Sequence, residues 1–449
     1  MSRHPTKRER RESPDSGVPP RRLAVPPEPP KIWPEKVIGT KYVRLLEQQL
    51  QQLRGVTAHG NRRLFLDDVF IAYLLAFFNP TIRSLRTIED LSQTVPAQKH
   101  LSVEKICKST LSDFNRLVDP QRLTPILQAL RGQLSRRQCR QPRVEHDLQE
   151  LLQRTIAVDG TFLHAVAEVA WAVANSNHHG ARRHRARLDA HLDVSTWLPE
   201  VIVVPEPGQS EADSASESLQ AGRIYLYDRG YLSFALLRAH YSASVETTAS
   251  ALVAQAHFVV RYKPAGGNSP ELEEAVERPL TAEDRAAGVL SDRVGYFTSE
   301  HARQAGIAKI QLREVLIAYV DQGQQKTLRL LTNLLDVPAR TVGWLYRARW
   351  QVELFFRWFK SIGHFGHLIS YSSEGVLTHL YVTIIAMLLM YLHTGHRPSK
   401  YMFALLSQVA AGAATLDEIM PILRERERRK ELDRASAARR RAKKKSASA

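Results

Sequence analysis

Hydrophobic positions follow helical spacing near both ends of the chain and strand spacing in its middle third. Between residues 43 and 53, apolar side chains recur every three or four positions, as on one face of a helix. The apolar segment 67–78 ends at Asn79-Pro80, and proline disfavours helical conformation in the residue before it. We therefore expect residues 41–150 to form a helical domain.

The polar segment 102–119 has the length and polarity of a helix-turn-helix pair, an arrangement that can place a helix on DNA. At its end, Asp119 before Pro120 is typical of a helix start, with the aspartate as N-cap. Such patterns are common in any helical domain, so a DNA-binding pair and an ordinary helical pair both remain open. The arginine-rich residues 135–147 predict a linker.

Apolar and alternating segments between residues 155 and 262 predict strands. One ends at Asp159, before Gly160, and another ends at Asp228 and leads into a helix. Three antiparallel strands followed by strand, helix and strand resemble the order of a ribonuclease-H-like α/β fold with a mixed sheet. The expected elements are strands at 155–159, within 187–204 around a turn near 195–199, at 223–228 and at 257–262, a helix at 231–240, and loops at 178–185 and 208–221.

Residues 264–333 interrupt the step from the last of these strands to the next helix, and they predict a β-rich insertion. Its strands are expected near 294–298, 310–320 and 327–332. Apolar helices are expected at 376–392 and 402–411. The longest apolar run, 380–392, is shorter than the ~20 residues that span a membrane, so we expect a buried helix and no membrane partner.

Segment 344–360 contains neither glycine nor proline and predicts one helix, apolar enough to be buried nearly all round. Its polar residues Tyr346, Arg349, Glu353 and Lys360 would fall within an arc of roughly 60° at helical spacing. One face would then carry a carboxylate flanked by two cations and a phenol. A plain salt bridge between Arg349 and Glu353, four residues apart, explains the same pattern without a function.

The chain carries a net charge of +17 and has a pI near 9.9, which indicates a polyanionic partner such as nucleic acid. Part of the excess positive charge lies in the C-terminal segment. A basic tail on an otherwise neutral enzyme is therefore the alternative to a polyanionic partner. Cys107 and Cys139 lack metal-type spacing and indicate a reducing compartment. With no apolar signal core at the N-terminus, we expect a soluble, cytoplasmic protein.

Asp159 and Asp228 would end adjacent strands, and Glu353 would face them from a helix. These three acids are the candidate catalytic carboxylates, because acidic oxygens are the ligands that Mg²⁺ prefers. Asp159 before glycine could instead form a turn, and Asp228 could pair with Arg229. The rival acids are Glu168, Asp189 and Asp193. A zinc site is disfavoured because no cysteine accompanies the nearby histidines His178, His179, His184 and His191.

The spacing Tyr-x2-Arg-x3-Glu-x6-Lys resembles the signature of the DDE transposases of the insertion-sequence-four family. The matching contexts are VDGT, YLYDRGY and YRARWQVE, and the resemblance extends over roughly residues 155–395. It implies that Asp159, Asp228 and Glu353 are catalytic and bind Mg²⁺, with Mn²⁺ as the alternative ion. It also implies that Tyr346, Arg349 and Lys360 bind the DNA end.

The resemblance implies a metal-dependent endonuclease and strand transferase, a transposase that cuts transposon ends and joins them to target DNA. Its partners would be terminal inverted repeats and target DNA, with a homodimer assembled on DNA, near the bacterial nucleoid. A catalytically silent, DNA-binding descendant and a general nuclease of the same fold are the alternatives. The expected domains are a disordered basic, proline-rich tail at 1–40, a helical domain and linker at 41–150, a catalytic core at 151–263 and 334–395, a β-rich insertion at 264–333, and a helical, basic tail at 396–449.

Overall fold

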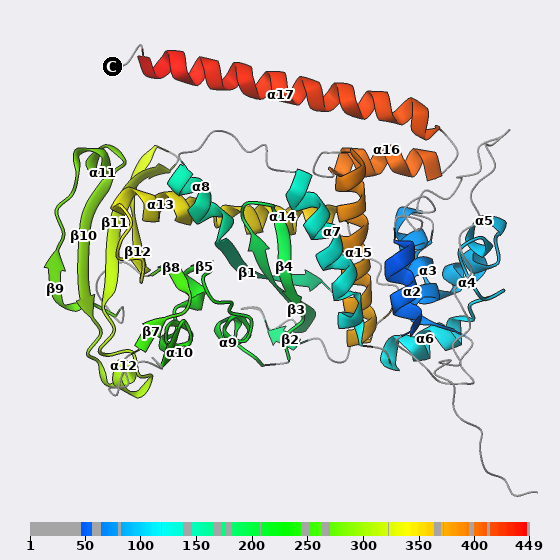
Figure 1. Ribbon diagram of the computed structural model, residues 1–449, viewed down its shortest axis with the longest axis horizontal. Helices are drawn as coiled ribbons and strands as arrows, with labels where there is room; N and C mark the ends of the chain where they lie inside the picture. Colours follow the sequence, from blue (N-terminus) through cyan, green and yellow to red (C-terminus); the bar gives the residue numbers. More distant parts are fainter. Residues whose placement is uncertain are drawn as a thin grey trace, which may run out of the picture. The chain divides into compact units, whose positions relative to one another are not determined.

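The chain divides into two compact units, residues 1–133 with 362–449 and residues 134–361, in a computed structural model (Figure 1). The structure describes residues 46–55, 64–79, 82–117, 119–137, 146–164, 173–176, 182–206, 208–243, 252–262, 270–321, 323–362, 370, 372–394, 399–410 and 414–446. The tail expected at 1–40 lies outside these residues. The second unit ends at Ser361. The expected continuation of the core to residue 395 stays a prediction.

The first unit is helical. Its elements are α2 (Glu47–Gly55), α3 (Leu66–Phe78), α4 (Leu85–Ser92), α5 (Val95–Gln98), α6 (Lys108–Leu117), η1 (Pro120–Leu123), most of α7 (Thr124–Arg137), α15 (Ser373–Thr394), α16 (Lys400–Ala410) and α17 (Leu416–Ser446). Every residue of α3 is buried, and α15 packs against α3, η1 and α6. Residues Glu374–Leu392 are long and apolar enough to cross a membrane, but 83% of that segment is buried inside the protein, as in a core helix.

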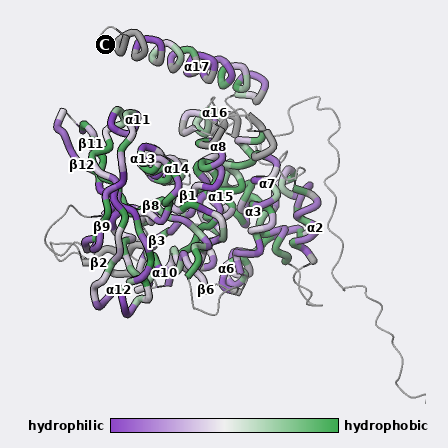
Figure 2. The backbone as a smooth tube through the Cα atoms, turned by 60° about the vertical axis from the view of Figure 1, so that its left-hand side comes forward, coloured by the Kyte–Doolittle hydropathy of each residue, from purple (hydrophilic) through white to green (hydrophobic). Residues whose placement is uncertain are grey.

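Several predictions for this unit are confirmed and one is wrong. Helix α3 ends at Asn79, and the Asp119 carboxylate accepts a hydrogen bond from the Gln121 amide, as an N-cap does. Segment 102–119 is not a helical pair, because α6 is the only helix among its described residues and residues 101–107 precede it without helical structure. Helix α17 continues to Ser446, and Figure 2 shows it largely hydrophilic along its length.

The second unit contains a large mixed sheet, as the strand pattern predicted. Its strands, in spatial order, are β2 (Val173–Ser176), β3 (Arg182–Asp193), β1 (Thr155–His164), β5 (Ile224–Tyr227), β8 (His257–Arg261), β12 (Gln324–Thr332), β11 (Leu312–Asp321), β10 (Val289–Tyr296) and β9 (Glu273–Glu277), with β4 (Leu198–Val203) paired to β3. Strands β1, β5 and β8 run parallel, and the other pairs are antiparallel. The short strands β6 (Tyr241–Ala243) and β7 (Leu252–Ala254) pair separately.

The β-rich insertion extends this same sheet. Strand β12 pairs with β8, so the insertion strands continue outward from the parallel strands (Figure 1). The three expected insertion strands correspond to β10, β11 and β12, whereas β9 was not expected. Neither were the short helices α11 (Ala282–Ala286) and α12 (Glu300–Gln304).

Three local predictions around the parallel strands are wrong. Strand β1 does not end at Asp159 but continues through Gly160 to His164, paired with β3. Residues 182–185 belong to β3 and not to a loop. The polar segment 208–221 contains the helix α9 (Glu211–Ser216), whose N-cap Ser210 accepts a hydrogen bond from the Asp213 amide. The remaining helices are α8 (His146–Gln153), η2 (Arg229–Tyr231) and α10 (Phe234–Ala239).

Segment 344–360 is not one helix. Helix α13 (Ala339–Arg347) ends, and α14 (Trp350–Ile362) begins after a break at Ala348-Arg349. Across the break the amides of Ala348, Arg349 and Gln351 bond to carbonyls three residues earlier, which tightens the turn. The prediction that four side chains share one face of a single helix is therefore wrong for Tyr346 and Arg349, which precede α14. Helix α14 is also not buried all round, since Trp350 is 49% exposed and Leu354 is 38% exposed.

Candidate active site

Asp159 and Asp228 lie on neighbouring parallel strands. The register of β1 and β5 pairs Ala157 with Leu226, and two steps further along the strands it brings Asp159 level with Asp228, directly after β5. Side chains alternate between the two faces of a strand. Ile156 and Val158 join the hydrophobic core with α9 and α10, so Asp159 projects from the opposite face.

Helices α13 and α14 bring the signature residues to these aspartates. The Tyr346 hydroxyl donates a hydrogen bond to Asp228 Oδ1 over 3.3 Å. Arg349 Nη1 lies 3.7 Å from Asp159 Oδ2, and Nη2 of the same guanidinium donates to Glu353 Oε1. The salt bridge between Arg349 and Glu353 that spacing alone explains is therefore present. It is also part of a wider cluster that links all three carboxylates to Tyr346 and Arg349.

The aromatic face of α14 holds Glu353 in this cluster. Phe355 and Trp358 meet the Trp197 ring edge-on, with ring centroids 5.8 Å and 5.1 Å apart. Trp197 closes the turn between β3 and β4 and has a positive φ of 62°. Phe355 also stacks on Phe359. These ring contacts fix how α14 is turned about its axis, and its other side carries Glu353, which pairs with Arg349.

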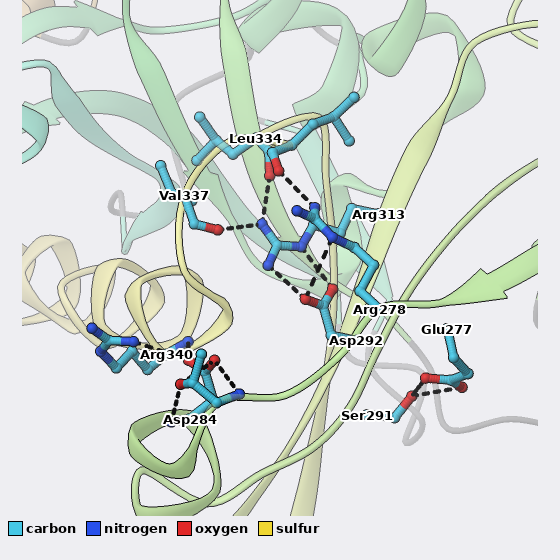
Figure 3. Close-up of polar contacts among 11 residues, drawn as sticks. Glu277, Arg278, Asp284, Ser291, Asp292, Arg313, Leu334, Val337 and Arg340 are labelled. Atoms are coloured by element: carbon cyan, nitrogen blue, oxygen red, sulfur yellow. Dashed lines mark hydrogen bonds and ion pairs between the residues drawn. The ribbon is translucent and has the colours of Figure 1, made fainter.

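A buried ion-pair network fixes the segment that leads into α13 (Figure 3). Arg313 of β11 is 1% exposed and bonds to both carboxylate oxygens of Asp292, over 2.7 Å and 2.8 Å. The same guanidinium donates to the carbonyl oxygens of Leu334 and Val337. The insertion strands are thereby attached to the start of the helix that carries Tyr346.

The cluster is partly buried, which changes its ionisation. Side-chain exposure is 22% for Asp159, 30% for Glu353 and 12% for Arg349. Burial raises the pKa of Asp159 to about 7, and the Arg349 charge opposes this increase without cancelling it. Burial likewise raises the pKa of the Tyr346 hydroxyl. Without a bound cation, the neutral form of Asp159 is therefore favoured up to near-neutral pH.

Lys360 lies seven residues beyond Glu353 on α14, two helical turns away on the same side. Its side chain is exposed, and no ion pair between described residues involves it. The structure therefore brings five of the six predicted site residues into one cluster, Asp159, Asp228, Tyr346, Arg349 and Glu353, and leaves Lys360 on the adjacent surface.

The rival acids have other partners. Asp189 pairs in register with Gly160, so it projects from the face opposite to Asp159, and it forms an ion pair with Arg187 over 2.9 Å. Asp193 accepts hydrogen bonds from the backbone amides after β3 and forms the turn. Glu168, His178 and His179 lie outside the described residues, as does the side chain of His184. His191 is buried edge-on to Tyr225, and burial lowers its pKa to about 4.

Glu211 is an acid near the site that the sequence did not reveal. Its Oε1 lies 2.8 Å from where a Cβ on Gly160 would be, and its Oε2 lies 3.6 Å from the corresponding position on Gly230. Glycine after Asp159 therefore leaves room for this carboxylate rather than forming a turn. The signal was the capping pattern Ser210-x-x-Asp213, which predicts a helix where we expected a loop.

The carboxylates suit a hard divalent cation by their chemistry, since Mg²⁺ prefers anionic oxygen ligands. Among the described residues, no three acidic or histidine side chains lie close enough together to hold a metal ion as they stand. Arg349 contacts Asp159 and Glu353 together. The donor set therefore fits by its chemistry, and a metal bound to Asp159 and Glu353 would displace this guanidinium.

Residues 150–389, more than half of the chain, match the family described as Transposase DDE domain, and all six predicted site residues lie within this range. The chain therefore belongs to the family of DDE transposase domains. It is 25% identical over 260 residues to a putative transposase, y4zB, of Sinorhizobium fredii, covering 57% of this chain and 63% of the relative. Over 65 residues it is 34% identical to a probable transposase for the insertion sequence element IS5377 of Geobacillus stearothermophilus, covering 14% of this chain and 17% of that one.

The chain thus spans less than two thirds of the length of each of these relatives. Among solved structures, it is similar to a piggyBac transposase synaptic complex with hairpin DNA. That similarity has a TM-score of 0.38 at 12% identity, and it covers 86% of this chain and 80% of the other.

Proposed function

We propose that this protein is the DNA transposase of an insertion sequence, which cuts transposon ends and joins them to target DNA. The observation that carries the proposal is the ion pair of Arg349 with both Asp159 and Glu353, beside the hydrogen bond from Tyr346 to Asp228. Residues far apart in the chain converge on one cluster, and this convergence supports the roles that the signature of the insertion-sequence-four family implies. Membership of that family is part of the proposal.

The catalytic unit is proposed to be a ribonuclease-H-like core. The strand order β4-β3-β1-β5-β8, antiparallel at first and then parallel, supports this assignment. We retain the expected domains as a proposal, namely a core at 151–263 and 334–395, an insertion at 264–333 and a helical domain at 41–150.

Asp159, Asp228 and Glu353 would hold Mg²⁺, with Mn²⁺ as the alternative, and two such ions, when bound, would stabilise charge on the attacking and leaving oxygens. The Tyr346 hydroxyl orients Asp228 by its hydrogen bond. Arg349 would exchange its carboxylate partners for a phosphate of the DNA end, a ligand that matches the guanidinium geometry. Lys360, exposed along the same helix, would contact a second phosphate.

The proposed partners are the terminal inverted repeats and target DNA, with a homodimer assembled on DNA in the bacterial cytoplasm near the nucleoid. The net charge of +17 supports a polyanionic partner. The retention of all three carboxylates argues against a silent, DNA-binding descendant.

Nicking of supercoiled plasmid tests this function, with and without the terminal repeats that flank the gene. We expect Mg²⁺-dependent nicks at the repeat boundaries, absent from the Asp159→Asn variant. Nicking that ignores the repeats would indicate a general nuclease, and repeat binding without any nicking would indicate the silent descendant.

A further inference from the structure

A cavity of about 350 Å³ lies at the carboxyl ends of the parallel strands β5 and β8. Its lining includes four arginines, Arg229, Arg261, Arg293 and Arg329. Arg229 directly follows Asp228, and Arg261 is the last residue of β8, the strand next to β5. The cavity therefore begins beside the catalytic carboxylates and extends over the insertion strands.

The charges of two of the four arginines are balanced by nearby carboxylates. Arg293 and Arg329 each bond to one oxygen of Glu314, over 2.6 Å and 2.7 Å. Both also pair with Glu271, over 3.4 Å and 2.7 Å. Arg329 stacks over the Tyr262 ring at 4.0 Å. Two carboxylates thus balance two guanidiniums. Arg329 and Glu314 are buried and Glu271 is exposed, and together with Arg293 they form the floor of the cavity.

The other two arginines have no such balance. Arg229 is exposed and Arg261 is half-buried, and neither forms an ion pair with an acid in the part of the chain that the structure describes. The lining residues therefore carry two uncompensated positive charges over a floor that is neutral. Guanidinium groups match the oxygens of a phosphate, and the partial burial of Arg261 strengthens its pair with a phosphate compared with open solvent.

We propose that this cavity binds a backbone phosphate of the DNA strand that lies at Asp228, through Arg229 and Arg261. The assignment rests on the proposed function, since it takes the strand from the catalytic carboxylates. A strand leaving Asp228 passes Arg229 first and then Arg261 at the end of the adjacent strand. The contact is sequence-independent, because phosphate carries no base information. It positions the strand relative to the carboxylates.

The test compares full-length Arg229→Gln and Arg261→Gln with the wild type in binding to end DNA over a range of KCl concentrations, without divalent metal. Each lost phosphate contact should reduce the slope of log K against log salt by about 1. Arg303→Gln is the matched control, because Arg303 is exposed on α12 and pairs only with Glu300 among described acids. Melting curves should show all three variants folded.

A second arm locates the contact with DNA ends that carry one neutral methylphosphonate at successive linkages. A methylphosphonate at the contacted linkage should reduce the affinity of the wild type for the DNA end. The same substitution should not reduce the affinity of Arg261→Gln, because this variant already lacks the contact. Equal losses in both proteins, or unchanged salt slopes, would overturn the proposal while leaving the transposase function intact. Inorganic phosphate that stabilises the wild type alone, with unchanged DNA slopes, would assign the cavity to a free anion and overturn the DNA contact. A wild type that fails to bind end DNA at all would overturn the proposed function itself.

Discussion

Arg349 lies between the acids of two distant parts of the chain, with Nη1 3.7 Å from Asp159 Oδ2 and Nη2 bonded to Glu353. In the protein without metal, this guanidinium is paired with Glu353 and lies beside Asp159, whose pKa burial raises to about 7. A divalent cation and Arg349 would therefore compete for Asp159 and Glu353. DNA offers the displaced guanidinium a phosphate in exchange, which would couple metal binding to end binding.

Replacing Arg349 by Ala should tighten metal binding in the absence of DNA. An ion pair of this exposure contributes on the order of 1 kcal/mol, which corresponds to roughly fivefold in affinity. Titration calorimetry with Mn²⁺ measures this change, and Arg357→Ala, on the exposed side of α14, is the control. The same variant should capture end DNA less well. A lower melting temperature with normal end binding and unchanged metal affinity would reduce Arg349 to a structural partner of Glu353.

Glu353→Gln should abolish nicking and strand transfer while end binding remains. The amide is a poor metal ligand, and losing several kcal/mol of charge stabilisation corresponds to more than about a hundredfold in rate. Stability should change little, because the variant loses one ion pair and one like-charge repulsion together. A Mg²⁺-dependent cleavage assay beside a melt of the same sample separates these effects. Wild-type cleavage rates in the variant would contradict the three-carboxylate site.

The metal-free protein should lose stability as the pH rises from about 4 to about 7. Burial raises the pKa of Asp159 from 3.8 to about 7, so the folded state keeps a proton that the unfolded chain has released. This contribution is fully present below the unfolded pKa and disappears as the pH passes the folded pKa. The slope should approach about 1.4 kcal/mol per pH unit for one such proton. Urea unfolding at several pH values measures it, and Asp159→Asn should lack it. An identical slope in that variant would assign the effect to other groups.

Gly160→Ala should destabilise the protein by about 1–3 kcal/mol. The new Cβ would lie 2.8 Å from Glu211 Oε1 and 2.9 Å from Asp189 Oδ1, inside ordinary contact distance. The matched control is Gly132→Ala on α7, where no atom lies within 4 Å of the added Cβ and helix propensity favours alanine. Thermal melts compare the two, and Glu211→Ala should restore part of the loss. Equal stability of both glycine variants would show that Glu211 does not crowd this strand.

Deleting residues from Arg424 onward should weaken non-specific DNA binding and flatten its salt dependence. Among the residues of α17 whose burial the structure describes, Leu423 is the last that is buried. The segment beyond it is rich in arginine and lysine, which displace counterions from DNA. The core should stay folded, with only helical circular dichroism reduced. Replacing Lys443, Lys444 and Lys445 by Gln is the control that keeps the chain length. Unchanged salt slopes in both variants would show that α17 does not contact DNA.

Local chemistry determined much of this protein. Interactions between neighbouring residues can be predicted from the sequence alone. They determine the end of α3 at Asn79, the N-cap at Asp119 and the strands β5 and β8. The three carboxylates were singled out by residue type, by position at predicted strand ends and on a predicted helix, and by the resemblance to the transposase family. Their catalytic role remains a proposal.

Tertiary packing decided what local pattern could not. The segment 344–360 has good helical propensity throughout, yet it breaks at Ala348-Arg349, and the break is what allows Tyr346 to reach Asp228 while Arg349 reaches Asp159. We interpreted Gly160 as a turn residue from the sequence. Its role is to leave room for Glu211, a residue about 50 positions away, and local pattern does not reveal that contact. The arginine cavity likewise joins strands from 229 to 329, and only folding brings their charges together. Propensity acts over one or two helical turns, whereas these contacts depend on distances in space that the order of residues does not specify.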